Sequence, residues 1–179
     1  MNFVNIVEDT DFLSDNQKAI IREVTLGAEF PWYWSNQQTE EISEGYLFHQ
    51  LLTRPEVGEN NQSKVNSSSY DFFISLLDSF CRKNNIEYHE VLRASVNCVF
   101  PCNAKTSPIH EDHAFEHNQL IIYLNDSPTS RTLIFNKNNK KIKSVKATQF
   151  KGIFFPNLPH AVQYPTEKER RVTAIFTFR

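Results

Sequence analysis

The chain has 179 residues, which is enough for one domain with a hydrophobic core and too few for two domains of ordinary size. Its composition, 40% hydrophobic and 13% aromatic, is typical of a globular protein and excludes an intrinsically disordered one. The formal charge is −2, from 19 basic and 21 acidic residues, so the composition does not point to nucleic acid as a partner.

The cysteines and the chain start bear on the compartment. Cys81, Cys98 and Cys102 are odd in number and lack a CxxC spacing, which argues against a disulfide framework and favours reduced thiols in a cytoplasmic protein. No apolar run approaches the roughly 18–20 residues that cross a bilayer, so we expect no membrane partner. Residues 1–5 lack the basic start and apolar stretch of a signal peptide.

The first half of the chain reads as helical. Ser14 to Gln17 fits a capping box, apolar residues follow at helical spacing, and Gly27 offers a stop. A second helix is predicted over residues 69–82, where one apolar stripe consists of Phe73, Leu76, Leu77 and Phe80. Between them lies the aromatic cluster 30–34, for which core or sheet packing and a wall of a substrate channel are both open readings.

From residue 91 the hydrophobic period changes to two. Eight short candidate strands follow, at 91–100, 108–112, 119–124, 132–135, 142–148, 152–155, 160–163 and 171–178. Turn-like residues separate several of them, notably 125–128 and 136–139. Short strands without intervening helices indicate a sandwich or barrel, and the helices would then buttress one sheet from outside. We expect a single domain, 1–179, with helical support and substrate-side segments in 1–90 and the barrel in 91–179.

His110 and Asp112 lie two positions apart in one candidate strand. Alternate side chains of a strand share a face, so we expect both to point into the barrel interior. A second histidine, His160, begins a later candidate strand. Two imidazoles and one carboxylate leave coordination positions open, which is the arrangement used for non-haem Fe(II) oxygen chemistry. The sequence therefore predicts a metal site formed by His110, Asp112 and His160.

The last candidate strand has two different faces. Arg171, Thr173 and Thr177 share one face, and the other carries Val172, Ala174, Phe176 and Phe178. If the aromatic face packs on the helices, Arg171 points into the barrel. A buried guanidinium needs an anion, and its fork geometry matches a carboxylate.

Together these residues resemble the Fe(II)- and 2-oxoglutarate-dependent dioxygenases, especially their prolyl-4-hydroxylase-like branch. The resemblance covers roughly residues 91–179 and rests on the order of His110-Glu111-Asp112, Ile121 to Asn125, Pro159 to Val162, and the late arginine. It implies a mainly β fold with supporting α-helices, a double-stranded β-helix (jelly-roll) barrel. One departure is that members often have a Gly-Gly pair where this chain has Ser127 to Arg131.

The resemblance also implies roles for site residues. The Fe(II) ligands would be His110, Asp112 and His160. Tyr123 and Arg171 would bind the distal carboxylate of 2-oxoglutarate. Arg170 is the alternative anchor, and we prefer Arg171 because it leaves the small Thr173 facing inward beside the cosubstrate. Asn97, on the first barrel strand, is a further candidate for the cosubstrate pocket.

By the same resemblance, the chain would use 2-oxoglutarate and O₂ to hydroxylate a C–H bond of a protein residue or a small molecule, releasing succinate and CO₂. One alternative is a non-catalytic barrel that binds a metal or another ligand, and another is a cupin-type metalloenzyme without 2-oxoglutarate. The anchoring Arg171 would have no purpose in the cupin reading. Glu111 should face away from the metal, and the remaining histidines are expected not to be ligands: His49, His89, His113 and His117.

Overall fold

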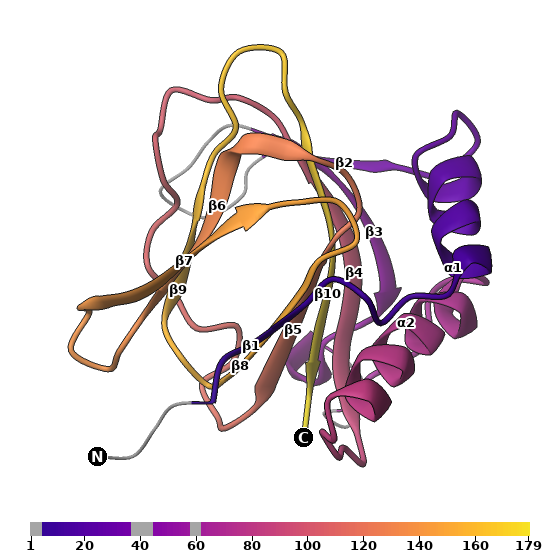
Figure 1. Cartoon of the computed structure of the whole chain (residues 1–179), viewed down its shortest axis with the longest axis horizontal. Helices are drawn as coiled ribbons and strands as arrows, with labels where there is room; N and C mark the ends of the chain where they lie inside the picture. The colour runs from indigo at the N-terminus through magenta and orange to yellow at the C-terminus, as the bar shows by residue number, and fades with distance from the viewer. Residues whose placement is uncertain (1–4, 37–44, 58–61) are drawn as a thin grey trace.

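Two antiparallel sheets form the two halves of a barrel (Figure 1). The computed structural model describes residues 5–36, 45–57 and 62–179. The larger sheet has seven strands in the order β1-β8-β5-β10-β4-β3-β2, and the smaller has three in the order β7-β6-β9. Side chains from both sheets pack against each other in one cluster that includes Ile121, Ile134, Val145 and Phe155. The expected mainly β, jelly-roll architecture is confirmed.

The bounds of the strands agree closely with the two-residue periodicity of the second half. The larger sheet comprises β1 (Val7–Asp9), β8 (Gly152–Pro156), β5 (Asn118–Tyr123), β10 (Arg171–Phe178), β4 (Val91–Val99), β3 (Tyr46–Leu52) and β2 (Tyr33–Ser35). The smaller comprises β7 (Lys141–Ala147), β6 (Ser127–Phe135) and β9 (His160–Gln163). The predictions for β9 and β10 coincide with the structure, and those for β4, β5, β7 and β8 agree to within one residue at each end.

Two helices cover the outer face of the larger sheet (Figure 1). α1 (Asp15–Ile20) begins at the predicted capping box, in which the Ser14 hydroxyl accepts from the Gln17 N–H and the Gln17 side chain accepts from the Ser14 N–H. It continues into a π-helical turn, η1 (Ile21–Thr25). α2 (Tyr70–Lys83) is the second predicted helix, and a 3₁₀ turn, η2 (Pro55–Val57), precedes it.

The two faces of β10 explain why the helices sit where they do. Val172, Ala174, Phe176 and Phe178 join the predicted stripe of α2 in one buried cluster, so the expected buttress is confirmed. The opposite face of the strand carries Arg171, Thr173 and Ile175 into the barrel. Burial of the aromatic face against the helices is what aims the guanidinium inward.

The prediction of a helical first half was incomplete, because it missed strands. Three strands of the larger sheet, β1, β2 and β3, come from the first 52 residues. β1 pairs with β8, so that Val7 faces Phe154, and β3 pairs with β4, so that Leu47 faces Cys98. These short segments become strands because they satisfy the open hydrogen-bonding edges of the barrel sheet. Pairing of this kind is non-local and leaves little periodicity in the segment itself.

Two strand predictions in the second half also need correction. Residues 108–112 form no strand, and the segment is held by single bridges between His110 and His160 and between Thr106 and Gln163. Pro108 lacks an N–H and so cannot extend a ladder. β6 starts at Ser127, earlier than predicted, because a register shift between Ser127 and Arg131 absorbs the residues read as a turn.

The remaining general expectations concern thiols and membranes. Cys81, Cys98 and Cys102 all lie in the described part of the chain and form no disulfide there. Within residues 5–36, 45–57 and 62–179, no helix combines the length and apolar character needed to cross a membrane.

Candidate functional site

A cavity of about 340 Å³ lies inside the barrel between the two sheets. The larger sheet contributes side chains of β4, β5 and β10, the smaller sheet those of β6 and β9, and the loop 107–112 closes part of the wall. The predicted site residues that line it are His110, Asp112, His160, Arg171 and Asn97. Tyr123 is fully buried behind this wall, and Arg170 is exposed to solvent.

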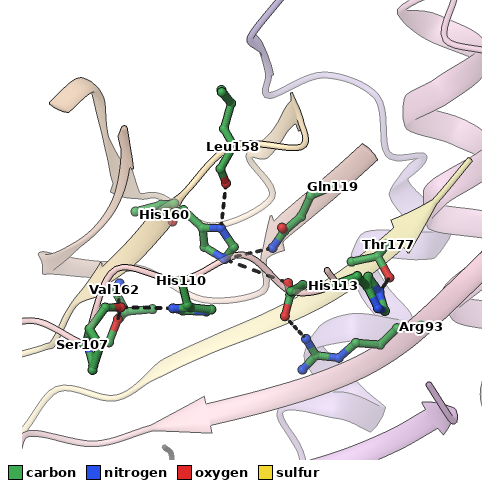
Figure 2. A network of polar contacts seen from close by, with 12 residues as sticks. Arg93, Ser107, His110, His113, Gln119, Leu158, His160, Val162 and Thr177 are labelled. Atoms are coloured by element: carbon green, nitrogen blue, oxygen red, sulfur yellow. Dashed lines mark hydrogen bonds and ion pairs between the residues drawn. The ribbon is translucent and has the colours of Figure 1, made fainter. Parts of the chain in front are cut away.

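The three predicted metal ligands line the same cavity, and Figure 2 shows His110 and His160 close to each other. His110 and His160 exchange two backbone hydrogen bonds of 3.0 and 2.9 Å, which places their rings 4.5 Å apart between centroids. Asp112 Oδ2 lies 3.9 Å from His160 Nε2. A single β-bridge between His110 and His160 thus brings the predicted ligands together inside the barrel, where a continuous strand had been expected.

Both histidines are oriented through their Nδ1 atoms. His110 Nδ1 is 3.0 Å from the carbonyl of Pro108, and His160 Nδ1 is 3.2 Å from the carbonyl of Leu158. Because a carbonyl only accepts, each Nδ1 carries a proton, and in the neutral form of the ring it is Nε2 that keeps the lone pair. Gln119 Nε2 donates to His160 Nε2 at 3.3 Å, in keeping with that assignment. This is the usual outer arrangement of metal-binding histidines.

Burial keeps His160 neutral. It lowers the pKa of His160 to about 4, although the nearby Asp112 carboxylate opposes the shift. At neutral pH the ring is therefore an unprotonated imidazole, which is the form that binds a metal ion.

Arg171 is a buried cation at the other end of the same cavity. Its Nη1 donates to the carbonyl of Arg131 at 2.9 Å and to the hydroxyl of Ser130 at 3.3 Å, and its Nη2 donates to Thr132 Oγ1 at 2.8 Å. All of these acceptors are neutral, and among the described residues no carboxylate forms a salt bridge with this guanidinium. Burial lowers the pKa of Arg171, so the folded protein bears a cost for a charge that an anion would offset.

The other predicted cosubstrate residues are placed differently from one another. Tyr123 stacks under Arg171, with the guanidinium carbon 5.2 Å from the ring centroid, and its hydroxyl lies 2.6 Å from Thr132 Oγ1. Asn97 pairs with Thr173 across β4 and β10, and both line the cavity. The side chain of Arg170 is exposed instead, and its backbone carbonyl accepts a hydrogen bond from the Asn125 side chain. Arg171 is therefore the arginine positioned to meet a ligand in the cavity.

The architecture is similar to that of solved oxygenase structures. An oxidoreductase of the 2OG-Fe(II) oxygenase family from Burkholderia pseudomallei has a TM-score of 0.75 at 12% identity, over 97% of this chain and 84% of that one. A Trichoplax adhaerens prolyl hydroxylase, solved with a peptide fragment of the hypoxia-inducible factor oxygen degradation domain, has a TM-score of 0.64 at 15% identity, over 99% and 84%. The chain has the 2OG-Fe(II) oxygenase fold.

A further structure with the oxygenase fold is a Pseudomonas putida prolyl-4-hydroxylase, with a TM-score of 0.59 at 13% identity, over 99% of this chain and 94% of that one. No family model and no curated protein matches the sequence. At these identities the similarity establishes the fold, and the roles of the residues have to be argued from the site itself.

Two arginines that the sequence analysis missed form hydrogen bonds with the Asp112 side chain and fix its position. Asp112 Oδ1 accepts from Arg93 Nη1 at 2.6 Å and from Arg54 Nη2 at 2.9 Å, and Arg54 Nη1 also donates to the Asp112 backbone carbonyl. Burial alone would raise the pKa of Asp112, but Arg93, His160 and Arg54 hold it far below its usual range. The carboxylate is thus ionised, with Oδ1 paired and Oδ2 turned toward His160.

This donor set fits the chemistry of a facial Fe(II) site, since it offers two imidazole lone pairs and one ionised carboxylate oxygen. In the part of the chain that the structure describes, no three His, Cys, Asp or Glu side chains already form a closed set of ligands. His110, Asp112 and His160 are adjacent without being drawn onto one point. Their assignment as Fe(II) ligands stays a prediction.

Other partners hold three of the residues that were not expected to bind the metal: His113, His117 and Glu111. His113 is buried and contacts Glu56 Oε1 and Thr177 Oγ1, the latter at 2.7 Å. His117 Nδ1 lies 2.9 Å from the Phe115 carbonyl. Glu111 borders the cavity, and its carboxylate pairs with Lys137 at 2.9 Å.

The aromatic cluster 30–34 divides between two environments. Phe30 is buried against Phe73, whereas Tyr33 and Trp34 are 55% and 60% exposed. No residue of the cluster 30–34 is in the described lining of the cavity, whereas Tyr46, on the neighbouring strand β3, is. The core reading therefore applies to Phe30.

Some of the missed residues had a signal in the sequence and others did not. Arg93 lies four positions before Asn97 on β4, so the alternation of a strand places both side chains on the same inward face. Gln119 follows in the same way from the inward face of β5. Arg54 stands in an irregular segment after β3, where no periodicity reports the direction of a side chain.

Proposed function

We propose that this protein is an Fe(II)- and 2-oxoglutarate-dependent dioxygenase that hydroxylates a C–H bond. The observation that carries the proposal is that one cavity contains both the candidate metal ligands and a buried arginine. This cavity holds two histidines whose Nδ1 atoms are fixed by backbone carbonyls beside an ionised Asp112, and it also holds a buried Arg171 whose described partners are neutral. A metal site alone would not need the second feature, and an anion site alone would not need the first.

The metal ligands would be His110, Asp112 and His160. When bound, Fe(II) supplies the redox chemistry by which O₂ oxidises both 2-oxoglutarate, to succinate and CO₂, and the substrate carbon. Pro108 and Leu158 would keep the imidazoles oriented through their carbonyls, so that both Nε2 atoms stay available as ligands.

Arg171 would bind the distal carboxylate of 2-oxoglutarate. Thr132 and Tyr123 hold the guanidinium in place from behind, the first by a hydrogen bond of 2.8 Å and the second by ring stacking. Asn97 and Thr173 form the adjacent wall, where they would contact the cosubstrate. Apolar side chains that exclude water complete the cavity: Ile121, Val162 and Ile175.

The oxidised group would belong to a protein residue or to a small molecule. The Trichoplax protein of similar fold was solved with a peptide fragment, which supports a peptide residue as one candidate. The proposed reaction releases one succinate and one CO₂ for each molecule of hydroxylated product, so measuring this ratio for a candidate substrate identifies the reaction.

Anaerobic titration with Fe(II) and 2-oxoglutarate tests the proposal. We expect the weak visible charge-transfer band of a 2-oxoglutarate–Fe(II) chelate in the wild type and in His89→Ala, whose side chain is exposed, and no band in His160→Ala. Fe(II) binding without the band would favour the cupin-type reading and remove the role of Arg171. The absence of any Fe(II) binding would mean that the barrel is a binding module.

A further inference from the structure

The cavity contains more positive charge than its own carboxylates balance. The arginines in its wall are Arg54, Arg93 and Arg171, and the carboxylates are Asp112 and Glu111. The Glu111 carboxylate is paired with Lys137. Within the cavity wall, Asp112 is therefore the anion left to balance three guanidiniums. Glu56, outside the wall, also attracts Arg54.

Loading the site as proposed above does not change this balance. Fe(II) is a divalent cation and 2-oxoglutarate is a dianion at neutral pH, so their charges cancel. The excess of positive charge stays in the cavity, where an unbalanced buried charge is costly. A substrate with an anionic group would offset it.

The position of the excess charge is well defined. Arg93, from β4, and Arg54, after β3, both donate to Oδ1 of Asp112, the oxygen that does not face His160. Arg171, by contrast, is held by Ser130, Arg131 and Thr132 of β6. The anionic group of a substrate would therefore be drawn to the Arg54 and Arg93 side of the candidate metal site.

Both arginines have the capacity to bind a second anion. A guanidinium has five N–H donors, and the one side-chain hydrogen bond of Arg93 to another described residue is that to Asp112. The side chain of Arg54 is 34% exposed and that of Arg93 is 14% exposed, so the pair extends from solvent toward the interior. They already bind one carboxylate in the structure, and the fork geometry suits a second.

We propose that Arg54 and Arg93 bind a carboxylate of the substrate next to the metal site, so that the substrate is a carboxylic acid. This inference rests on the proposed function. The carboxylate has two possible sources, the α-carboxylate of a free amino acid or the side chain of Asp or Glu in a peptide. A purely structural role, in which the arginines only fix Asp112, is the competing explanation.

Ligand binding to the Zn(II)-substituted protein saturated with 2-oxoglutarate tests the inference, because Zn(II) has no redox chemistry and the bound ligand is not turned over. One arm compares the L-amino acids with their amides. The other compares end-capped pentapeptides with central Asp or Glu against the same peptides with Asn or Gln. Saturation-transfer NMR identifies the binders, and calorimetry gives their dissociation constants.

We expect at least one acid to bind at least about tenfold more tightly than its amide, since a charge-assisted hydrogen bond is worth this much. The arm in which it appears identifies the source of the carboxylate. The preference should be lost in Arg54→Met and in Arg93→Lys, which keeps the charge but not the fork. It should persist in Arg82→Met, where an exposed arginine on α2 is removed.

The inference is wrong if no acid is preferred over its amide in the wild type, or if the preference survives in Arg54→Met. Zn(II) affinity separates it from the structural role. Loss of a nearby cation should leave Zn(II) binding to Arg54→Met unchanged or tighter, whereas a tenfold weaker affinity would mean that the arginine serves to fix Asp112. Failure of the wild type to bind Zn(II) and 2-oxoglutarate at all would overturn the proposed function and this inference with it.

Discussion

The guanidinium of Arg171, on β10, donates a hydrogen bond of 2.8 Å to Thr132 Oγ1, on β6, so that these two residues help to link the two sheets of the barrel. The same hydroxyl lies 2.6 Å from the Tyr123 hydroxyl, so one small side chain on β6 connects residues of β5 and β10. Because Thr132 is neutral, it orients the cation without neutralising it. The positive charge thus stays available to a ligand in the cavity.

Replacement of Arg171 should weaken 2-oxoglutarate binding. In Arg171→Ala the apparent KM for 2-oxoglutarate should rise at least about tenfold, because a buried charge-assisted pair with the distal carboxylate is lost. Arg170→Ala is the matched control, since its side chain is exposed, and we expect little change there. The dissociation constant from the anaerobic charge-transfer titration provides the same comparison without turnover. The reverse ranking of the two variants would mean that the neighbouring arginine is the anchor.

Gly152, on β8, lies against the side chain of Phe80 on α2. A Cβ at this position would lie 2.6 Å from two ring carbons of Phe80 and 3.1 Å from Phe12. We expect Gly152→Ala to lower the free energy of unfolding by roughly 1–3 kcal/mol through overpacking, as measured by urea denaturation. Adding Phe80→Leu should recover part of that loss, because it removes the ring that the new methyl group meets. Equal effects of the Ala substitution in both backgrounds would contradict this explanation.

The three thiols should differ sharply in reactivity. Burial raises the pKa of Cys81 to about 12 and that of Cys98 to about 11, while Cys102 is partly exposed. Since the thiolate is the reactive form, a disulfide reagent such as DTNB should titrate Cys102 first in the native protein, and the other two only on unfolding. Cys102→Ser should abolish the fast phase. A fast phase that persists in this variant would show that one of the buried thiols is accessible.

Glu8 should contribute stability that is lost in acid. Burial would raise its pKa, but hydrogen bonds and charges from Lys143, at 2.8 Å, and Lys151, at 3.4 Å, lower it below the ordinary value of 4.5. A lowered folded-state pKa means that the contribution is present above 4.5 and disappears as the pH falls through the folded-state pKa. The wild type should therefore be more stable than Glu8→Gln at pH 7 by up to about 1 kcal/mol, given the exposure of the pair.

The measurement is urea denaturation of both proteins at pH 7 and at a pH below the folded-state pKa of Glu8. Convergence of the two free energies of unfolding in acid is the expected result. A difference that does not depend on pH would show that the side chain acts through packing and not through its charge.

Local sequence patterns predicted most of the barrel strands in the second half of the chain, and they predicted some of the residues that line the site. The period-two alternation of residues 171–178 predicted both faces of β10, because an aromatic face must be buried whatever its partner is. His160 was proposed as the second histidine of a two-histidine, one-carboxylate set, at the start of a candidate strand that the structure has as β9. Asn97 was proposed from its place on the first barrel strand, and Arg93 on the same strand was not noticed.

The remaining features depended on contacts between distant segments. β1, β2 and β3 are strands because barrel edges offer them hydrogen-bonding partners, and His110 meets His160 through one bridge although Pro108 prevents a strand. The convergence of Arg54 and Arg93 on Asp112 joins three segments that carry no common pattern. The sequence by itself determined which strands bury an apolar face, since that preference is local and repeats every two residues. Only the tertiary structure decided which charges share the cavity, because electrostatic partners are set by distance in space and not by separation along the chain.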